Sequence, residues 1–495
     1  MTLFLRIIAE AQSGVQIGSF QGLADVGNPT IAGIAQYSEP NQQYILKASG
    51  SNIWFGEDSF SMVWRKMNDD FIVQTKIAFE GEGHEAHRKT GIMLRSTLYE
   101  SAPMVACTIH GDGLTSLQFR RTEGADVEEI KLDISGPDVL QLEKRGNTYI
   151  MSVARFGDVY QLAEVTDLDL GNDLYSGLFV CSHSNEYAEE VTFSNTRIFN
   201  TAPDDLVQYQ TYLPSLLEVL DVVSGNRSVL ASSESSWQAP NWTTDGETLI
   251  YNSNGLLYSF DLNSRESTVL ETGIAIKNNN DHILSFDGQQ IGISHHSKEQ
   301  NGNSLIYTMP ITGGEPKLIT EKGPSYLHGW SPDNQFLIYT AQRDGDYDIY
   351  KIPAQGGKEK RLTKTRGLDD GSEYSPDGKY IYFCSTRTGT MQLWRMDANG
   401  KNQIQLTHDA LNDWFPHVSP DGKWLVFISF PEDIAPDEHP FYERVYIRIM
   451  PTESGEIKTI GYLYGGQGSL NVPSWSPDSK SIAFISNGIF EYAQQ

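Results

Sequence analysis

A short turn motif that recurs six times is the feature that most constrains the fold of this chain. Its clearest copies read Trp-Ser-Pro-Asp at 330–333 and Ser-Pro-Asp-Gly at 375–378 and 419–422. The motif aspartates are 42, 46, 44, 44 and 57 residues apart, at Asp245, Asp287, Asp333, Asp377, Asp421 and Asp478. A period in this range indicates a repeat architecture, in which each copy forms one structural unit packed against its neighbours.

Each repeat predicts four short strands, as is typical of a β-propeller blade. In the third repeat, strand-like segments follow the motif at 336–340, 349–352 and 361–363. Only one strand follows the sixth motif, and the two missing strands match 217–221 and 228–230. The sequence therefore predicts a six-bladed propeller over 214–495. Its last blade would take two strands from each end, which leaves no exposed sheet edge.

The motif itself is interpreted as structural. Proline presets the backbone for a turn, aspartate accepts hydrogen bonds from the turn amides, and glycine tolerates a positive φ. The aromatic residue before the motif is expected to pack between blades. Functional residues are therefore expected among those that do not repeat.

Residues 13–201 predict a second and different β unit. About ten strand-like segments alternate with polar turns, and alternate residues of 71–77 are suited to face a core. This pattern is typical of a two-sheet sandwich. Pro203 and the acid pair Asp204-Asp205 interrupt it, so 202–213 is interpreted as a linker. The whole chain is thus expected to be all-β.

Composition argues against several classes of function. The formal net charge of −27 repels phosphate backbones, so nucleic acid is not an expected partner. Acidic polymers would be repelled as well, except at a local basic or metal-bearing site. The three cysteines lie in apolar segments and are expected to be buried thiols rather than a disulfide framework. No run reaches the ~18 apolar residues that a membrane span requires.

The first twelve residues carry a feature of export. Residues 3–8 are apolar, and the Ala-Glu-Ala sequence at 9–11 is similar to the end of a cleaved signal. A full signal needs a basic start and a longer apolar stretch. We interpret 1–12 as the remnant of a signal peptide shortened at its start, which predicts a periplasmic or secreted protein. The alternatives are a disordered N-terminus and a cytoplasmic location.

Two resemblances to known families extend this interpretation. The first is to concanavalin-like sandwich domains of the enolase-regulation-like type, and it implies a jelly roll. It rests on Asp25–Pro29, Ile53-Trp54, Asp58-x-Phe60, Asp70-Phe71, Lys89–Arg95 and Gly111–Gly113. The Ser-Pro-Asp-Gly repeats, with Ile-Tyr strands and Leu-Thr ends, resemble the six-bladed propeller of TolB and its relatives. The pairing of both domains, together with segments 413–417, 439–442 and 464–468, is similar to Bacteroidetes-type TolB-like proteins.

The TolB-like resemblance implies a fold and leaves the function open. That superfamily includes periplasmic scaffolds, peptidase propellers and oligogalacturonate lyase, and fold alone does not choose among them. In a propeller, the loops that enter the innermost strands open on the central channel, where ligands commonly bind. The candidate ligand-binding residues at this predicted mouth are Tyr326, His328, Asp370, Glu373, Asp413, Trp414, His417, His439, Tyr464 and Gln467.

Three functions are compatible with this set. In the first, aromatic rings stack on sugars while acids and histidines bond the hydroxyls, so the protein binds glycans in a glycan-utilisation or envelope system. The second is a metal-dependent glycan lyase or hydrolase similar to oligogalacturonate lyase, with catalytic residues that the sequence does not identify. It needs a divalent metal, manganese or zinc, held by His282, His328, His417 and Glu373. The third is an envelope scaffold for protein partners. We expect carbohydrate binding.

The N-terminal unit holds a weaker candidate site in two polar loops. Its residues are His87, Arg88, His110 and Asp112. Imidazole, guanidinium and carboxylate groups in this pattern suit either a metal ion or an acidic sugar.

Overall fold

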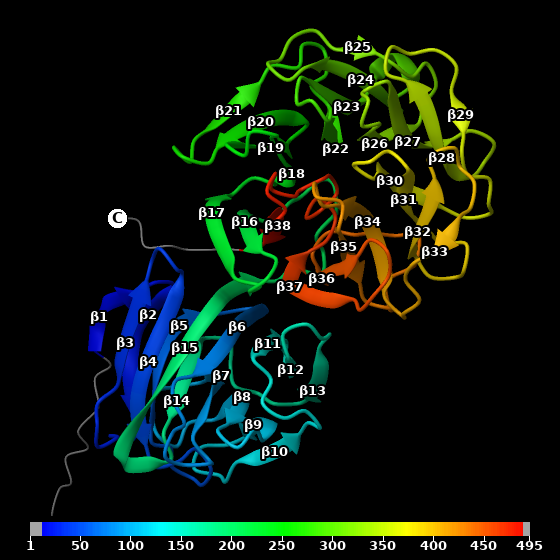
Figure 1. The fold of residues 1–495 in the computed structure, drawn as a ribbon. Coiled ribbons are helices and arrows are strands. Elements are labelled where there is room, and N and C mark those ends of the chain that lie inside the picture. The colour runs from blue at the N-terminus through cyan, green and yellow to red at the C-terminus, as the bar shows by residue number, and fades with distance from the viewer. Residues whose placement is uncertain (1–11, 489–495) are drawn as a thin grey trace, which may run out of the picture. The chain divides into compact units, whose positions relative to one another are not determined.

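The computed structural model describes residues 12–488, which divide into two compact units (Figure 1). The N-terminal unit ends at Pro203, and the propeller unit spans Asp204–Gly488. Across the described residues every regular element is a β-strand except one 3-10 turn, Lys298–Gln300, so the chain is all-β as expected. No helix among these residues is long and apolar enough to cross a membrane. The expected signal remnant, 1–12, lies outside the described residues apart from Gln12.

Two antiparallel sheets make up the N-terminal unit. One runs in the order β1 (Gln12–Ile17), β2 (Phe20–Val26), β5 (Phe60–Met67), β14 (Leu174–Cys181), β7 (Lys89–Arg95), β8 (Met104–His110), β9 (Thr115–Arg120) and β10 (Glu128–Lys131). The other runs in the order β13 (Gln161–Val165), β12 (Thr148–Ala154), β11 (Val139–Arg145), β6 (Phe71–Phe79), β15 (Ser184–Asn200), β4 (Gln43–Gly50) and β3 (Ile34–Ser38).

Both sheets contribute side chains to one apolar core. Val63 and Ile92 of the first sheet lie in the same buried cluster as Leu46 and Val73 of the second. Removing this apolar surface from water is the main force that holds the two sheets together. The concanavalin-like jelly roll stays a prediction for this unit.

The propeller unit consists of six sheets arranged in a ring (Figure 1). Blades one to three are β18 (Gln238–Trp242) to β21 (Ser267–Leu270), β22 (Asn278–Leu284) to β25 (Lys317–Leu318), and β26 (Ser325–Trp330) to β29 (Lys360–Arg361). Between these lie β19 (Thr248–Ser253), β20 (Leu256–Asp261), β23 (Gln290–His296), β24 (Ser304–Pro310), β27 (Phe336–Gln342) and β28 (Tyr347–Pro353). Blades four and five comprise β30 (Asp369–Tyr374), β31 (Tyr380–Ser385), β32 (Gln392–Asp397), β33 (Ile404–Gln405), β34 (Asn412–Val418), β35 (Trp424–Phe430), β36 (Glu443–Pro451) and β37 (Lys458–Gly465).

The sixth sheet joins the two ends of the propeller unit. It runs in the order β17 (Arg227–Ser233), β16 (Ser215–Asp221) and β38 (Ser481–Asn487). In place of the expected innermost strand there is a single bridge, Trp475 to Ile482. The segment that leads to this bridge contains Gly466, Gly468 and Pro473, and these residues disfavour a continuous strand.

The repeated motif forms the turn between the first and second strand of each blade, as expected. In all six copies a Ser or Thr hydroxyl donates a hydrogen bond to the motif aspartate, for example Ser331 to Asp333. The aspartate also accepts a bond from a turn amide, as from Gln335 at 3.1 Å. The preceding tryptophan reaches the neighbouring blade, since Trp330 Nε1 donates to the carbonyl of Ile283. The motif is therefore structural.

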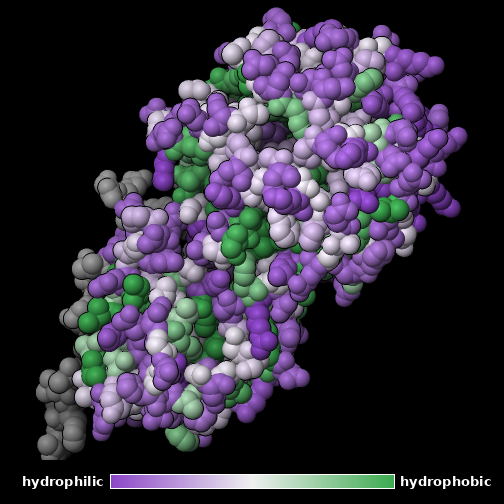
Figure 2. All heavy atoms as spheres, viewed as in Figure 1, coloured by the Kyte–Doolittle hydropathy of each residue, from purple (hydrophilic) through white to green (hydrophobic). Residues whose placement is uncertain are grey.

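Hydrophilic side chains predominate on the visible face of the propeller, and this face is hollowed within the ring of blades (Figure 2). The three cysteines, Cys107, Cys181 and Cys384, are buried free thiols, as their apolar sequence context predicts. They contribute to packing.

Candidate ligand-binding site

A cavity of about 560 Å³ lies where the innermost strands of consecutive blades converge. Its side chains come mainly from the first strands of blades two to five, and from the loops before β36 and after β37. The lining consists of Tyr209, Asn279, Asn280, Asp281, His296, Tyr326, His328, Thr340, Tyr347, Leu368, Asp370, Phe415, Asp437, His439, Gln467 and Asn471. We call it the mouth cavity.

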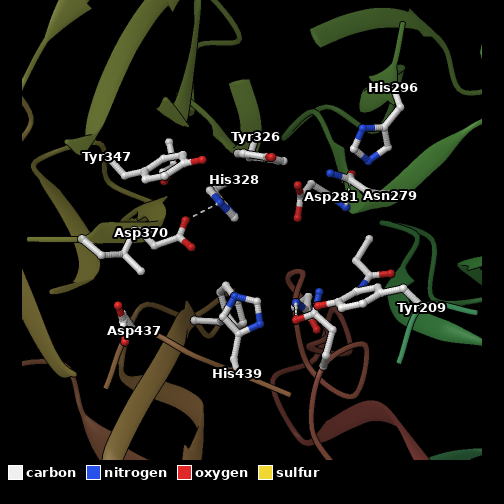
Figure 3. Close-up of a pocket in the computed structure, with 16 residues that line it drawn as sticks. Tyr209, Asn279, Asp281, His296, Tyr326, His328, Tyr347, Asp370, Asp437 and His439 are labelled. Atoms are coloured by element: carbon white, nitrogen blue, oxygen red, sulfur yellow. Dashed lines mark hydrogen bonds and ion pairs between the residues drawn. The ribbon is translucent and has the colours of Figure 1, made fainter. Parts of the chain in front are cut away.

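His328 lies between two carboxylates in the mouth cavity (Figure 3). Its Nε2 is 2.8 Å from Oδ1 of Asp370. This is an ion-pair distance, although the ring nitrogen is not aligned for a hydrogen bond. The carboxylate of Asp281 lies on the opposite side of the ring (Figure 3). His328 and Asp281 are buried, and the Asp370 side chain is 14% exposed. The trio therefore concentrates charge in a buried part of the cavity.

Burial and mutual contact set the charges of this trio. Burial raises the pKa of Asp281 to about 6, and the nearby His328 limits the rise. Burial also acts upward on Asp370, but the ion pair with His328 outweighs it and lowers the Asp370 pKa to about 2. For His328, burial lowers the pKa, and the two carboxylates raise it above its ordinary value. The shifts of the Asp370 and His328 pKa values both favour an ion pair between these residues, and beside it lies Asp281, a second carboxyl whose pKa is raised.

Uncharged hydrogen-bonding groups surround the trio. His439 packs edge-on against Trp414 with ring centroids 4.4 Å apart, and its buried Nδ1 has no hydrogen-bond partner among the described residues. Burial lowers the His439 pKa, which keeps its imidazole neutral. The rings of Tyr326 and Tyr347 lie 6.5 Å apart. Burial raises the pKa of both phenols, so they remain protonated and can donate.

The charged side chains of the lining are acidic apart from its histidines. It includes Asp281, Asp370 and Asp437, and none of its residues is lysine or arginine. Carboxylates at a concave site repel anions and attract cations. The mouth cavity is therefore suited to a neutral or cationic ligand.

Five of the ten residues predicted at the propeller mouth line this cavity. They are Tyr326, His328, Asp370, His439 and Gln467. The other five lie outside the lining, and each has a structural contact.

Glu373 and His417 bind each other. His417 Nδ1 lies 2.7 Å from Oε2 of Glu373, and its Nε2 lies 3.3 Å from the carbonyl of Leu470. The second carboxylate oxygen of Glu373 accepts a bond from the amide of Val418 at 2.9 Å. This pair joins β30 to β34 between neighbouring blades.

Asp413, Trp414 and Tyr464 are buried within blade five. Asp413 lies 3.0 Å from Arg448 and accepts a bond from Ser429 at 2.7 Å. Trp414 is fully buried, and Tyr464 is 3% exposed. Neither ring presents a face on which a sugar could stack, because both are enclosed by protein. Trp414 and Tyr464 are therefore not part of the lining of the mouth cavity, and their assignment to ligand binding stays a prediction.

The four proposed metal ligands do not form one site. Of His282, His328, His417 and Glu373, only His328 lines the mouth cavity. The buried His282 has its Nε2 3.1 Å from the carbonyl of Ile250, and His417 is held by Glu373. Among the described residues, one group of three His, Cys, Asp or Glu side chains has ligand atoms close enough to share a metal, and it lies in the N-terminal unit.

The N-terminal candidates are brought together in part. Ligand atoms of His87, His110 and Asp112 all lie within 4.8 Å of one another. Arg88 is engaged elsewhere, because its Nη1 lies 2.6 Å from the buried carboxylate of Glu189. Three of the four predicted residues therefore form a cluster.

Several lining residues were missed in the sequence. Asp281, with Asn279 and Asn280, belongs to the polar run before the motif of blade two, and this run was the signal that could have revealed them. Counting back from the motif makes His282 equivalent to His328. However, the bulges in the two strands differ in size. In β22, the four steps from Asn278 to His282 pair with two steps of β23, whereas in β26 the two steps from Leu327 to Gly329 pair with one step of β27. This one-residue difference turns Asp281 to the cavity and His282 away.

A six-bladed propeller with an acidic, tyrosine-lined cavity inside its ring is the class of protein that these residues define. Residues 328–436 match the family model of the TolB beta propeller domain. An uncharacterised protein of Agrobacterium fabrum is 42% identical over 272 residues, which make up 55% of this chain and 92% of the relative. The chain therefore belongs to the TolB-like β-propeller family.

Two further proteins are similar to parts of the chain. The structure of a candidate TolB from Agrobacterium tumefaciens is 40% identical with a TM-score of 0.54, and the match covers 57% of this chain and all of that one. A TolB homologue of Chlorobaculum tepidum is 31% identical over 84 residues, or 17% of this chain and 19% of that protein. The Bacteroidetes-type pairing of propeller and sandwich stays a prediction.

Proposed function

We propose that the mouth cavity binds a carbohydrate that is neutral or carries an amine. The observation that carries this proposal is a lining that combines tyrosine rings with carboxylates and contains no lysine or arginine. Its volume of about 560 Å³ lies within the ~300–1,000 Å³ range of small-molecule sites. Tyrosine offers an apolar ring for the faces of a sugar and a hydroxyl for its rim.

Each part of the lining has a role in this proposal. Tyr326 and Tyr347 form an aromatic wall, and the Asp370 carboxylate accepts hydrogen bonds from sugar hydroxyls. The unpartnered Nδ1 of His439 bonds a further hydroxyl. An unsatisfied polar group in a buried site costs free energy, and a ligand that pairs with it removes that cost.

The same lining selects against acidic sugars. A uronate or phosphate would lie beside Asp281, Asp370 and Asp437 without a compensating lysine or arginine. Like charges at short range in a partly buried site disfavour binding strongly. We therefore expect neutral sugars and amino sugars to bind and uronates to be rejected, which argues against a pectin-like substrate.

Screening the purified protein on an array of neutral, amino and uronic sugars tests this proposal. A sugar that binds is then titrated by calorimetry against Tyr326→Ala and Asp370→Asn. Tyr326→Ala removes a ring of the aromatic wall, and Asp370→Asn removes a charged hydrogen-bond acceptor. The dissociation constant of each variant is expected to rise about tenfold or more. The control is Trp424→Ala, which removes an exposed aromatic ring outside the cavity and leaves affinity unchanged. Binding restricted to uronates would overturn the proposal.

Membership of the TolB-like family favours a second candidate, a scaffold that binds protein partners in the cell envelope. In that case a basic peptide rather than a sugar would enter the acidic cavity. Cross-linking in cells followed by capture would recover one defined partner, and Asp370→Asn would weaken its recovery. The family also supports a periplasmic location, which fractionation of cells that carry the native gene would test.

A further inference from the structure

We propose that His87, His110 and Asp112 of the N-terminal unit bind a divalent transition metal of the zinc class. This inference is independent of the propeller and of its ligand. Two imidazoles and one carboxylate are a ligand set that suits zinc, whereas calcium requires six to eight oxygen ligands. Three protein ligands leave a further position open, as in catalytic zinc sites.

The backbone holds the two loops of this cluster in register. β7 and β8 are paired so that Lys89 lies opposite His110. Beyond this pair, the amide of Gly111 donates to the carbonyl of Arg88 at 2.8 Å. The amide of Asp112 donates to the carbonyl of Ala86 at 2.9 Å. The proximity of the three ligands therefore follows from the strand ladder and does not depend on side-chain conformation alone.

His110 is the buried ligand of the cluster. Its side chain lies within the sheet, 5% of the residue is exposed, and its Nδ1 has no hydrogen-bond partner among the described residues. A buried ring nitrogen without a partner is uncommon, because most buried polar atoms are satisfied. Coordination of a metal would satisfy it.

The other two ligands can adjust to a metal. The side chains of His87 and Asp112 are 55% and 40% exposed, and His87 Nδ1 is 3.8 Å from Asp112 Oδ2. Asp112 Oδ1 accepts a bond from the amide of Leu114 at 3.0 Å, and this leaves Oδ2 for a metal. Ligand atoms around a tetrahedral zinc lie about 3.3 Å apart, given bonds of about 2.0 Å. Small rotations of exposed side chains would close the remaining gap.

A neighbouring histidine and a lysine define the surroundings. The ring of His183 lies 5.7 Å from that of His87, and its Nδ1 also has no hydrogen-bond partner among the described residues. Lys89 opposes a cation, but its Nζ is held by Asn52 Oδ1 at 2.8 Å and by the carbonyl of Ile53 at 3.0 Å. The positive charge of Lys89 is thus held by its own partners, and His183 lies beside His87 but outside the group of three whose ligand atoms converge.

Titration of the full chain with zinc chloride, after dialysis against a chelator, tests the site by calorimetry. One equivalent is expected to bind. Asp112→Asn, an exposed and conservative change, and His110→Ala are each expected to weaken binding at least about tenfold. The matched control is His84→Ala, which removes a nearby histidine that stacks on Tyr187 at 4.1 Å outside the triad; it leaves binding unchanged. Manganese and calcium chloride are titrated in parallel.

Two results would overturn this inference. One is the absence of zinc binding by the parent protein. The other is zinc binding that both triad variants retain but that His328→Ala abolishes, which would place the metal in the propeller instead. Asp112→Asn keeps the test decisive if His110→Ala fails to fold, because Asp112 lies at the surface of a turn.

Discussion

Replacing Asp58 by asparagine is expected to destabilise the N-terminal unit by about 3–5 kcal/mol. Asp58, Arg95 and Arg120 have fully buried side chains. Oδ2 of Asp58 lies 3.0 Å from Arg95 Nη1, and Oδ1 lies 2.6 Å from Arg120 Nη2. The substitution keeps the shape but removes the only carboxylate that pairs with both guanidinium groups in the described residues. Two buried positive charges would then lie close together without the carboxylate that bridges them, although each keeps hydrogen bonds to backbone carbonyls.

This loss is measured by urea unfolding followed by hydrogen exchange. Peptides from residues 12–203 report on the N-terminal unit alone. The matched control is Asp173→Asn, which breaks an ion pair with Lys66 at 2.5 Å whose side chains are 69% and 36% exposed. Exposed pairs contribute about 0–1 kcal/mol, so the control should change little. Equal losses in both variants would mean that the buried charges of Asp58, Arg95 and Arg120 are not what holds this region together.

The role of Asp58 illustrates what the sequence could not reveal in the N-terminal unit. In the sequence, Asp58-x-Phe60 contributes only to a family resemblance. Its partners Arg95 and Arg120 lie 37 and 62 residues further along the chain. Such contacts are created by sheet order, and the order β5-β14-β7-β8-β9 cannot be read from alternating hydrophobicity. Strand positions were predictable here, whereas the charge network was not.

The propeller was far more predictable because its information is local and repeated. Each Ser-Pro-Asp turn makes the same short-range hydrogen bonds, such as Ser375 to Asp377 at 2.7 Å. Six such turns at a regular period specify the number of blades without knowledge of any distant contact. The sixth blade departed from the template where Gly466, Gly468 and Pro473 replace strand-forming residues.

The mouth cavity was predicted only in part because the innermost strands contain bulges. The register shifts between Asp370 and Glu373 in β30 and between Trp414 and His417 in β34. A bulge reverses which side chains face the channel beyond it. Asp370, before the shift in β30, lines the cavity, and Glu373 beyond it does not; in β34 neither Trp414 before the shift nor His417 beyond it lines the cavity. Distance from the turn motif is therefore a poor guide to exposure in these strands.

Replacing Asp281 by asparagine is expected to stabilise the propeller unit at high pH and not at low pH. Burial raises the pKa of Asp281 from its ordinary value of 3.8 to about 6. The folded state therefore binds a proton more tightly than the unfolded chain, and stability falls as pH rises through this interval. Above pH 6 the ionised Asp281 carboxylate lowers the free energy of unfolding by the full amount, about 3 kcal/mol. Asp281→Asn carries no charge and removes that cost.

Urea unfolding from pH 4 to 8, read on peptides of residues 204–488, measures this difference. The difference in free energy of unfolding between Asp281→Asn and the parent protein should be near zero at pH 4 and reach its full size above pH 6. Asp437→Asn is the control, since it removes an exposed carboxylate of the same cavity and should change stability little. If Asp281→Asn instead destabilised the protein at pH 8, the ionised carboxylate would be supporting the fold through its attraction to His328. The buried charge would then have a structural role rather than one reserved for a ligand.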